Sequence, residues 1–144
     1  MPKMVIAENV RRKLESARVA RLATVSPKAA PHVIPVCFVF DGSVIYSAID
    51  RKPKRTPLRQ LARLTNIETN PRVALVLDEY DDDWERLWYV LVRGKAGLLT
   101  TEAEHERAVT QLKAKYPQYR AGMLDVDAPV LRITPERITS WGRL

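Results

Sequence analysis

The chain has 144 residues, of which 46% are hydrophobic, and a formal net charge of +7 at pH 7. This length and composition predict one domain, residues 1–144, with a core of its own. No apolar run reaches the ~18 to 20 residues that span a bilayer, and the charged N-terminus is unlike a signal peptide, so we expect a cytoplasmic protein without a membrane partner.

The excess of positive charge is compatible with nucleic-acid binding, because lysine and arginine neutralise phosphates whatever the base sequence. The distribution of charge argues against this partner. An acidic run with six carboxylates lies at 78–85, where it would repel a long polyanion, and the chain has no helix-turn-helix, zinc-finger or aromatic-basic pattern. We therefore expect no nucleic-acid partner.

The first fifty residues predict a helix followed by strands. Apolar residues at helical spacing predict an amphipathic helix at about 6–17, and alternation predicts a strand at 18–25. The β-branched and aromatic run at 31–40 and the run at 43–49 predict a hairpin with its tight turn at Asp41-Gly42.

Pro35 lies in the middle of the run at 31–40. Because proline has no N–H for a neighbouring strand, this strand must lie at a sheet edge, contain a bulge, or face something other than a strand at that point. Two interpretations remain open: a plain edge or bulge, and a bulge that exposes backbone amides to a bound ring. Cys37, in the same run, is the single cysteine, and we expect it to be a buried small hydrophobe rather than a reactive thiol.

The second half of the chain begins with a basic helical insertion at about 51–67. Strands are predicted at 72–78 and 87–99, separated by an acidic loop. Gly94 and Gly97 in the second of these strands allow a bend of the kind that closes a small barrel.

A further helix is predicted at 101–115, with Thr101 as its N-cap and Glu104 at the capping-box position. Strands at 128–134 and 137–141 complete the chain. About seven strands and three helices, with hairpin connections, predict a mainly β fold, a six- to seven-stranded antiparallel β-barrel with accessory helices rather than βαβ units.

The residue types that carry catalysis do not occur in recognisable patterns. His32 and His105 lack metal-ligand spacing, so we expect no metal site. No G-x-S-x-G elbow, Walker A motif or G-x-G-x-x-G sequence occurs. If the protein is an enzyme, its reactivity must come from a cofactor, for which the chain supplies binding, orientation and electrostatics.

Six cations and no carboxylate lie between residues 51 and 67. This basic segment is the candidate anchor for a cofactor phosphate, since Arg59 and Arg63 are four residues apart and share one helical face. A solvated, solubilising face is the competing interpretation, and the sequence leaves both open. The six cations are Arg51, Lys52, Lys54, Arg55, Arg59 and Arg63.

Four aromatic residues are candidates to frame a flat ring. Side chains of this kind more often fill a core or a dimer interface. The sequence alone does not choose between these roles for Trp84, Trp88, Tyr89 and Trp141.

The order of these features resembles the split β-barrel family of pyridoxamine-phosphate-oxidase-like oxidoreductases, which use a flavin or deazaflavin. The resemblance covers RLATVSPKAAPHVIPVCFVFDGSVIYSAID, NIETNPRVALVLDEY and LWYVLVRGKAGLL. Within the family, the chain is most similar to the subgroup that uses the 8-hydroxy-5-deazaflavin coenzyme F420. The shared motifs are KPK at 52–54, the loop DEYDDDW and the late Ser140-Trp141.

The resemblance implies a split barrel of the FMN-binding type that forms a homodimer, with cofactor sites at the subunit interface. It places the tricyclic ring against two strands, here His32, Val33, Ile34, Pro35 and Val36 in one and Ser47, Ala48, Ile49 and Asp50 in the other. It assigns the phosphate to basic residues that match Lys52, Lys54 and Arg63, with Arg55 and Arg59 nearby. Trp84 or Trp88 of the second subunit would cover the site, with Trp141 as a further candidate.

The family usually has a compact K-x-R-N-L segment, whereas this chain has Arg63-Leu64-Thr65-Asn66-Ile67. Arginine thus stands at the lysine position and threonine where arginine is usual, so the sequence leaves open which cation contacts the phosphate.

The resemblance implies a coenzyme F420-dependent oxidoreductase that transfers a hydride between the reduced deazaflavin and a small organic substrate. The surplus of cations suits the acidic tail of this cofactor, which carries more negative charge than the single phosphate of FMN. Two alternatives stay open: an FMN-dependent enzyme, and a non-catalytic carrier of flavin or haem.

Overall fold

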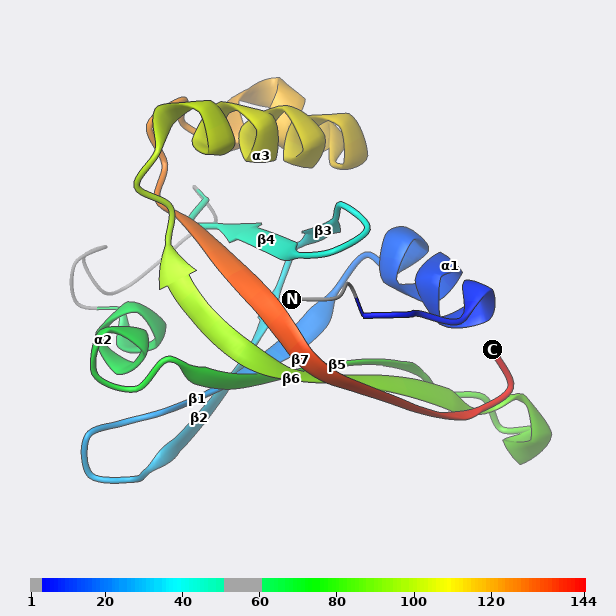
Figure 1. Cartoon of the computed structure of the whole chain (residues 1–144). Coiled ribbons are helices and arrows are strands. Elements are labelled where there is room, and N and C mark those ends of the chain that lie inside the picture. Colours follow the sequence, from blue (N-terminus) through cyan, green and yellow to red (C-terminus); the bar gives the residue numbers. More distant parts are fainter. Residues whose placement is uncertain (1–3, 51–60) are drawn as a thin grey trace.

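The computed structural model describes residues 4–50 and 61–144 (Figure 1). Within these ranges, seven strands form one antiparallel sheet in the order β2-β1-β5-β6-β7-β4-β3. The strands are β1 (Ala20–Val25), β2 (Pro31–Val36), β3 (Val39–Phe40), β4 (Ile45–Ala48), β5 (Arg72–Glu79), β6 (Trp88–Leu98) and β7 (Val130–Gly142).

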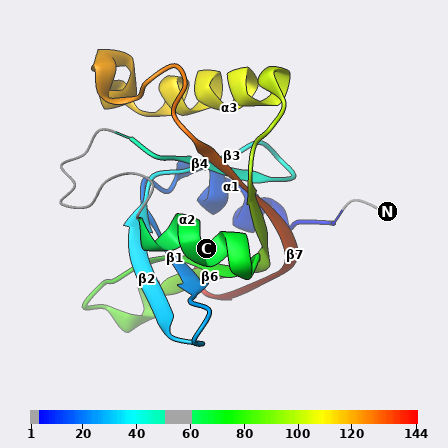
Figure 2. The same cartoon turned by 90° about the vertical axis from the view of Figure 1, so that its left-hand side faces the viewer.

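Three α-helices surround this sheet in the described ranges: α1 (Glu8–Ser16), α2 (Ala62–Thr69) and α3 (Glu102–Lys115). Two short helical turns, η2 (Trp84–Arg86) and η3 (Tyr119–Met123), follow β5 and α3. Figure 2 shows α2 beside β1 and β2, with α3 beyond β3 and β4 on the other side of the molecule. None of the described helices is long and apolar enough to cross a membrane.

The sheet curls so that its two edge strands are neighbours along the chain. β2 and β3 lie at opposite ends of the strand order, yet only Cys37 and Phe38 separate them. The chain therefore crosses from one edge of the sheet to the other in two residues, which gives a half-closed barrel (Figure 1). This confirms the predicted mainly β fold, an antiparallel split barrel with accessory helices.

Side chains from the end of α3 hold this crossing in place. The Tyr116 hydroxyl oxygen accepts a hydrogen bond from the Phe38 N–H (3.0 Å), and the hydroxyl donates to the Arg18 carbonyl (2.8 Å). The Lys115 ammonium donates to the Phe38 carbonyl (2.9 Å). Because Phe38 is fully buried, these bonds satisfy backbone groups that no neighbouring strand reaches.

The core lies inside the curl and is filled by alternate residues of the strands. Leu22, Leu75, Val90 and Ile133 are fully buried there, and α1 covers one opening with Val10 and Leu14, as its amphipathic pattern predicts. A second cluster under α3 includes Leu112 and Tyr116.

The strand predictions are confirmed in position, with three differences. The run predicted at 31–40 is divided into β2 and β3 by the crossing. The hairpin after β3 has a four-residue loop, because Phe40 pairs with Ile45 and the Asp41 carboxylate accepts bonds from the backbone at Ser43 and Val44. The strands predicted at 128–134 and 137–141 are one strand, β7, in which a bulge at Glu136 absorbs the Pro135 position.

The predicted helix at 101–115 is confirmed, but its capping box is wrong. Thr101 is the N-cap residue without a side-chain capping bond. Glu104 instead accepts hydrogen bonds from the Tyr46 hydroxyl (2.7 Å) and from Arg132 (2.8 Å). These bonds across to β4 and β7 compete with the cap for the same carboxylate and attach the helix to the sheet.

Candidate functional site

Arg63 is a half-buried cation in the first turn of α2. Among residues 4–50 and 61–144, its guanidinium has no carboxylate within 4.0 Å. The sequence of 51–60 contains no aspartate or glutamate either. Burial lowers the pKa of Arg63, while the charge of Asp50 acts in the opposite direction. A partly buried cation without a paired acid is costly, and an anionic ligand would offset that cost.

Asp50 lies beyond the end of β4 and directly before the basic segment. Its carboxylate accepts a hydrogen bond of 2.6 Å from the hydroxyl of Tyr119 in η3. Burial and this bond to Asp50 both raise the pKa of Tyr119, so the phenol keeps its proton and acts as the donor. Asp50 and Tyr119 are hydrogen-bonded, and both groups act electrostatically on Arg63. Asp50 directly precedes residues 51–60, and Arg63 follows them closely.

The sequence places four further candidates, Lys52, Lys54, Arg55 and Arg59, in residues 51–60, which lie outside the described part of the chain. The first ten residues of the helical insertion predicted at about 51–67 lie there too. The described helix, α2, continues to Thr69, and Asn70 and Pro71 follow at its C-terminal end, where proline is common.

β2 is an edge strand, as the proline in its middle predicts. The Ser26 N–H donates to the Ala30 carbonyl (2.9 Å), so Ser26 and Ala30 are a hydrogen-bonded pair. In the antiparallel register of β1 and β2, every second pair from this one is hydrogen-bonded as well. Residues 32, 34 and 36 then bond to β1, and the backbone groups of 31, 33 and 35 face the open edge. Because Pro31 and Pro35 have no N–H, Val33 carries the one N–H that β2 presents at this edge.

The side chains of β2 alternate between two environments. His32 and Ile34 are half-buried and Val36 is buried, whereas Val33 is 60% exposed and Pro35 is exposed. The Nδ1 atom of His32 is buried and has no hydrogen-bond partner among the described residues. A buried, unsatisfied nitrogen costs about 1 to 3 kcal/mol, so this atom is a second place at which a ligand or water would complete the structure.

Three of the four contact residues predicted at the end of β4 are buried within this chain, and the fourth, Asp50, is half-buried. Ser47, Ala48 and Ile49 are 3 to 5% exposed. The Ser47 hydroxyl donates to the Cys37 carbonyl (2.8 Å), so its polar group serves the crossing between β2 and β3. Cys37 packs against the α3 cluster as a half-buried side chain, whereas the sequence predicted a buried one.

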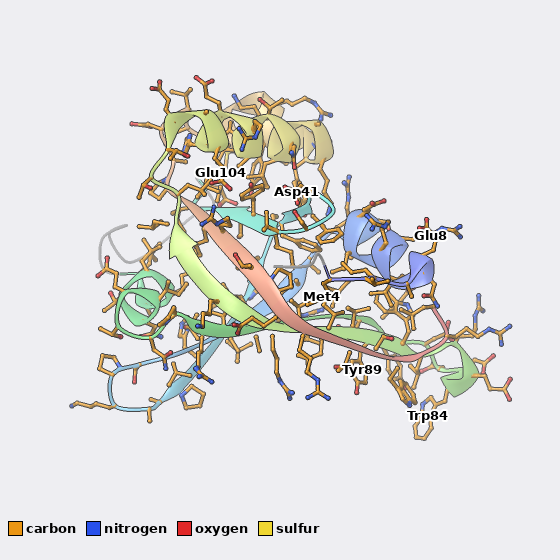
Figure 3. All side chains as sticks on the ribbon, in the orientation of Figure 1. Met4, Glu8, Asp41, Trp84, Tyr89 and Glu104 are labelled. Carbon is orange, nitrogen blue, oxygen red and sulfur yellow. The ribbon has the colours of Figure 1, made fainter. Side chains whose placement is uncertain are left out.

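The tryptophans lie far from Arg63 within one subunit. Figure 1 places η2, which carries Trp84, at the opposite end of the molecule from α2, and Figure 3 shows Trp84 and Tyr89 projecting from that end. Trp84 is 72% exposed and Trp141 is 53% exposed and stacked on Tyr89, with ring centroids 6.0 Å apart. Trp88 is buried, with its indole N–H donating to Glu79 (3.2 Å).

A pocket of about 540 Å³ lies at this tryptophan end. Cations and carboxylates line it in equal number around Trp88, and the Lys13 ammonium lies 4.5 Å from the centroid of the indole ring. Its lining residues are Lys13, Glu79, Asp81, Asp83, Arg86, Trp88 and Arg143.

Sequence reasoning missed two residues of the site. Tyr119 lies 69 residues from Asp50 along the chain, and no local pattern connects them. Asn66 is buried in α2 and donates to the Thr24 hydroxyl (3.0 Å), which attaches the helix to β1. A buried asparagine on an otherwise apolar helix face was the available signal for the second. In the described ranges, no group of three or more His, Cys, Asp or Glu side chains could hold a metal ion.

The family model described as pyridoxamine 5'-phosphate oxidase matches residues 6–142. The chain belongs to the pyridoxamine 5'-phosphate oxidase family. This confirms the resemblance drawn from the sequence at the level of the family, whose members are split barrels that bind flavins. A search of curated proteins finds no match.

Three solved structures have the same fold as this member of the pyridoxamine 5'-phosphate oxidase family, each with 22% sequence identity or less. A conserved hypothetical protein from Mycobacterium tuberculosis is 22% identical, with TM-score 0.72, over 99% of this chain and 88% of the other. A putative pyridoxamine 5'-phosphate oxidase from Listeria innocua is 22% identical, with TM-score 0.69, over 94% and 98%. A haem storage protein from Vibrio cholerae is 17% identical, with TM-score 0.71, over 96% and 95%.

Proposed function

We propose that the protein is a cytoplasmic oxidoreductase that binds coenzyme F420 and transfers a hydride between the reduced deazaflavin and a small organic substrate. The observation that carries the proposal is Arg63, a half-buried guanidinium without a carboxylate partner in the described ranges. In a family of flavin-binding split barrels, such a cation is suited to hold a cofactor phosphate.

The ring of the cofactor would lie along the open edge of β2. Val33 offers an N–H at this edge, and the carbonyls of residues 31, 33 and 35 offer acceptors. A heterocycle that carries both acceptor and donor atoms on its rim matches this alternation. When bound, reduced deazaflavin supplies the hydride, and the chain's own part is to hold the ring in place and keep one face open to substrate.

Coenzyme F420 is favoured over FMN because of the amount of positive charge. The segment from 51 to 67 carries six cations and no carboxylate, which is more than the single phosphate of FMN requires. The acidic tail of F420 adds further negative charge for the remaining cations to neutralise.

We also propose that the protein is a homodimer that packs through the outer face of its sheet. Cross-strand pairing places several apolar or half-exposed residues on this face, among them Val33, Ala23, Ala74, Val76, Leu91, Thr139, Tyr89 and Trp141. One end of the face carries Arg72, Arg93 and Arg137. The other end carries the acidic loop and Asp78, which pairs with Arg21 on the same face (2.8 Å). Two subunits packed face to face with their ends reversed would place the basic end of each face against the acidic end of the other. The same packing would bring Trp84 of each subunit toward Arg63 of its partner.

Two alternative functions would use the same site, formed by Arg63 and the open edge of β2. An FMN-dependent enzyme is supported by membership of the pyridoxamine 5'-phosphate oxidase family. A non-catalytic carrier is supported by two observations. No acid or nucleophile in the described ranges is one that the proposed chemistry requires, and the fold is shared with a haem storage protein.

The test is a set of parallel titrations of the purified protein with F420, FMN and haem, followed by fluorescence or absorbance. We expect F420 to bind most tightly. Tighter binding of FMN would replace the proposal by the flavin enzyme. Steady oxidation of reduced F420 with an added nitroaromatic or conjugated carbonyl acceptor would support the enzyme, whereas tight binding without turnover of any acceptor tried would favour the carrier.

A further inference from the structure

We propose that the pocket at the tryptophan end binds a small zwitterion of the amino-acid class. Lys13 and Arg143 would hold the carboxylate of the ligand, and Glu79 would hold its ammonium group. The volume of the pocket is about 540 Å³, within the range of about 300 to 1,000 Å³ that small-molecule sites usually have. This inference is independent of the proposed cofactor, because neither Arg63 nor β2 lines the pocket.

Trp88 brings three elements together at this pocket. It pairs with Glu79 of β5 on one side and with Gly142 of β7 on the other, and the Lys13 ammonium of α1 lies 4.5 Å from the centroid of its ring. In Figure 1, α1, the loop after β5 and the C-terminus meet at this end of the molecule. Trp88 is buried on the core side of β6, so the pocket lies apart from the outer face of the proposed dimer.

Backbone contacts fix Arg143 and Glu79 at the edge of the pocket. The Arg143 N–H donates to the Leu87 carbonyl (2.8 Å). The preceding Gly142 has a φ of 91°, and an added Cβ would collide with the same carbonyl, so this close approach requires glycine. The Glu79 Oε2 accepts a hydrogen bond from the Trp88 indole N–H (3.2 Å), which leaves the other carboxylate oxygen for a ligand.

Charges of both signs line the pocket without pairing completely. Arg86 pairs with Asp81 (3.7 Å), whereas in residues 4–50 and 61–144 neither Lys13 nor Arg143 has a carboxylate within 4.0 Å. Every aspartate and glutamate of the chain lies in these ranges. Glu79 has no cation within 4.0 Å there either. A ligand that carries both signs can join these groups through charge-assisted hydrogen bonds.

The balance of charge in the lining determines the class of ligand. Three cations and three carboxylates line the pocket. A simple anion would gain from Lys13 and Arg143 but would lie among the carboxylates, and a simple amine would meet the reverse arrangement. A zwitterion presents each charge to its opposite. Because Trp88 is 7% exposed, it offers little apolar surface, so we expect recognition of the two charged groups rather than of one particular side chain.

The experiment titrates the isotope-labelled full chain with three probes and follows the tryptophan indole signals by proton–nitrogen NMR. The probes are L-leucine, isocaproate, which lacks the ammonium group, and isoamylamine, which lacks the carboxylate. We expect L-leucine to shift the Trp88 signal, assigned with Trp88→Phe, and to leave those of Trp84 and Trp141, which do not line the pocket. Each truncated probe should bind about tenfold more weakly or less.

Two variants assign the two ends of the ligand. Glu79→Gln keeps an acceptor for the Trp88 indole and removes the charge, so it should weaken L-leucine about tenfold and leave isocaproate unchanged. Arg143→Gln should weaken L-leucine similarly and leave isoamylamine unchanged. Arg12→Gln is the matched control, because it removes one positive charge from α1 outside the pocket, where Arg12 pairs with Glu8 (3.5 Å). It should leave L-leucine binding unchanged.

Three outcomes would overturn the inference. The first is a Trp88 signal that L-leucine does not move in the unmodified protein. The second is an affinity for isocaproate or isoamylamine equal to that for L-leucine, since the pocket would then recognise only one charge. The third is an equal effect of Arg143→Gln and Arg12→Gln on L-leucine binding, which would show a general effect of net charge.

Discussion

Gly94 of β6 lies directly against Thr134 of β7. A Cβ added at Gly94 would be 2.1 Å from the Thr134 carbonyl oxygen, at the bulge where Glu136 interrupts the ladder. Backbone atoms on both sides cannot move apart without breaking the two long strands. We therefore expect Gly94→Ala to lower the free energy of unfolding by about 2 to 4 kcal/mol, measured by urea denaturation.

Gly97 is the matched control for this prediction. It lies three residues further along β6, and an added Cβ would meet nothing within 4 Å. Gly97→Ala should change stability by less than about 0.5 kcal/mol, or increase it slightly by restricting the unfolded chain. Equal losses in the two variants would show that the close approach at Gly94 is not what requires glycine.

Replacement of Arg63 tests the anion site directly. We expect Arg63→Ala to weaken cofactor binding by about 1.5 to 3 kcal/mol, because a charge-assisted bond to phosphate is lost. Arg12→Ala is the control, since Arg12 is an exposed cation on α1 that pairs with the exposed Glu8 (3.5 Å). A fluorescence titration that gives the same affinity for both variants would move the phosphate to other residues.

The pH dependence of stability should reveal Lys115. Burial, with the charge of Arg18, lowers the pKa of Lys115 from 10.5 to about 8. Between these values the unfolded chain holds a proton that the folded protein has released, so this amine makes stability rise with pH from about 8 to 10.5. Below pH 8 both states are protonated and the full penalty of burying the charge remains.

The measurement compares urea midpoints of the unmodified protein and Lys115→Met at pH 7.5, 8.5 and 9.5. Methionine keeps much of the aliphatic side chain and removes the titrating group. Burial raises the pKa of Tyr116 to about 12, which lowers stability only above pH 10, so the chosen range avoids it. Parallel profiles for the two proteins would contradict the assignment to Lys115.

The proposed dimer is tested by a charge on the outer face. Leu91 is half-buried at the centre of this face, between Val76 and Thr139 in register. We expect the unmodified protein to sediment at twice the 16.4 kDa of the chain, and Leu91→Asp to sediment as a monomer with weaker cofactor binding. The exposed Val126 is remote from this face in sequence and sheet, and Val126→Asp should leave the mass unchanged.

Local patterns predicted most of the fold, because strands, helices and turns depend on neighbouring residues. The alternation in 18–25, the amphipathic run in 6–17 and Pro35 at an edge all correspond to elements of the structure. The division of 31–40 at Cys37 was not predicted, because it follows from where the curled sheet must cross. The continuity of β7 past Pro135 depends on the bulge opposite Gly94, which is a property of two strands together.

The candidate site could be predicted only where its residues lie in local motifs. Arg63 was found because it belongs to a dense run of cations. Tyr119 was not found, because its role depends on how η3 packs against the end of β4. The expected contacts of Ser47, Ala48 and Ile49 with a ring stay a prediction; all three are buried within this chain.

The two prolines of β2 have an effect beyond the site. An uncovered strand edge is a template on which another chain can add a strand, and long flat edges lead to aggregation. Pro31 and Pro35 remove two of the three donors from this edge, so an incoming strand could not complete its ladder there. The barrel can thus remain open on this side, accessible to a small molecule, while resisting polymerisation through the same opening.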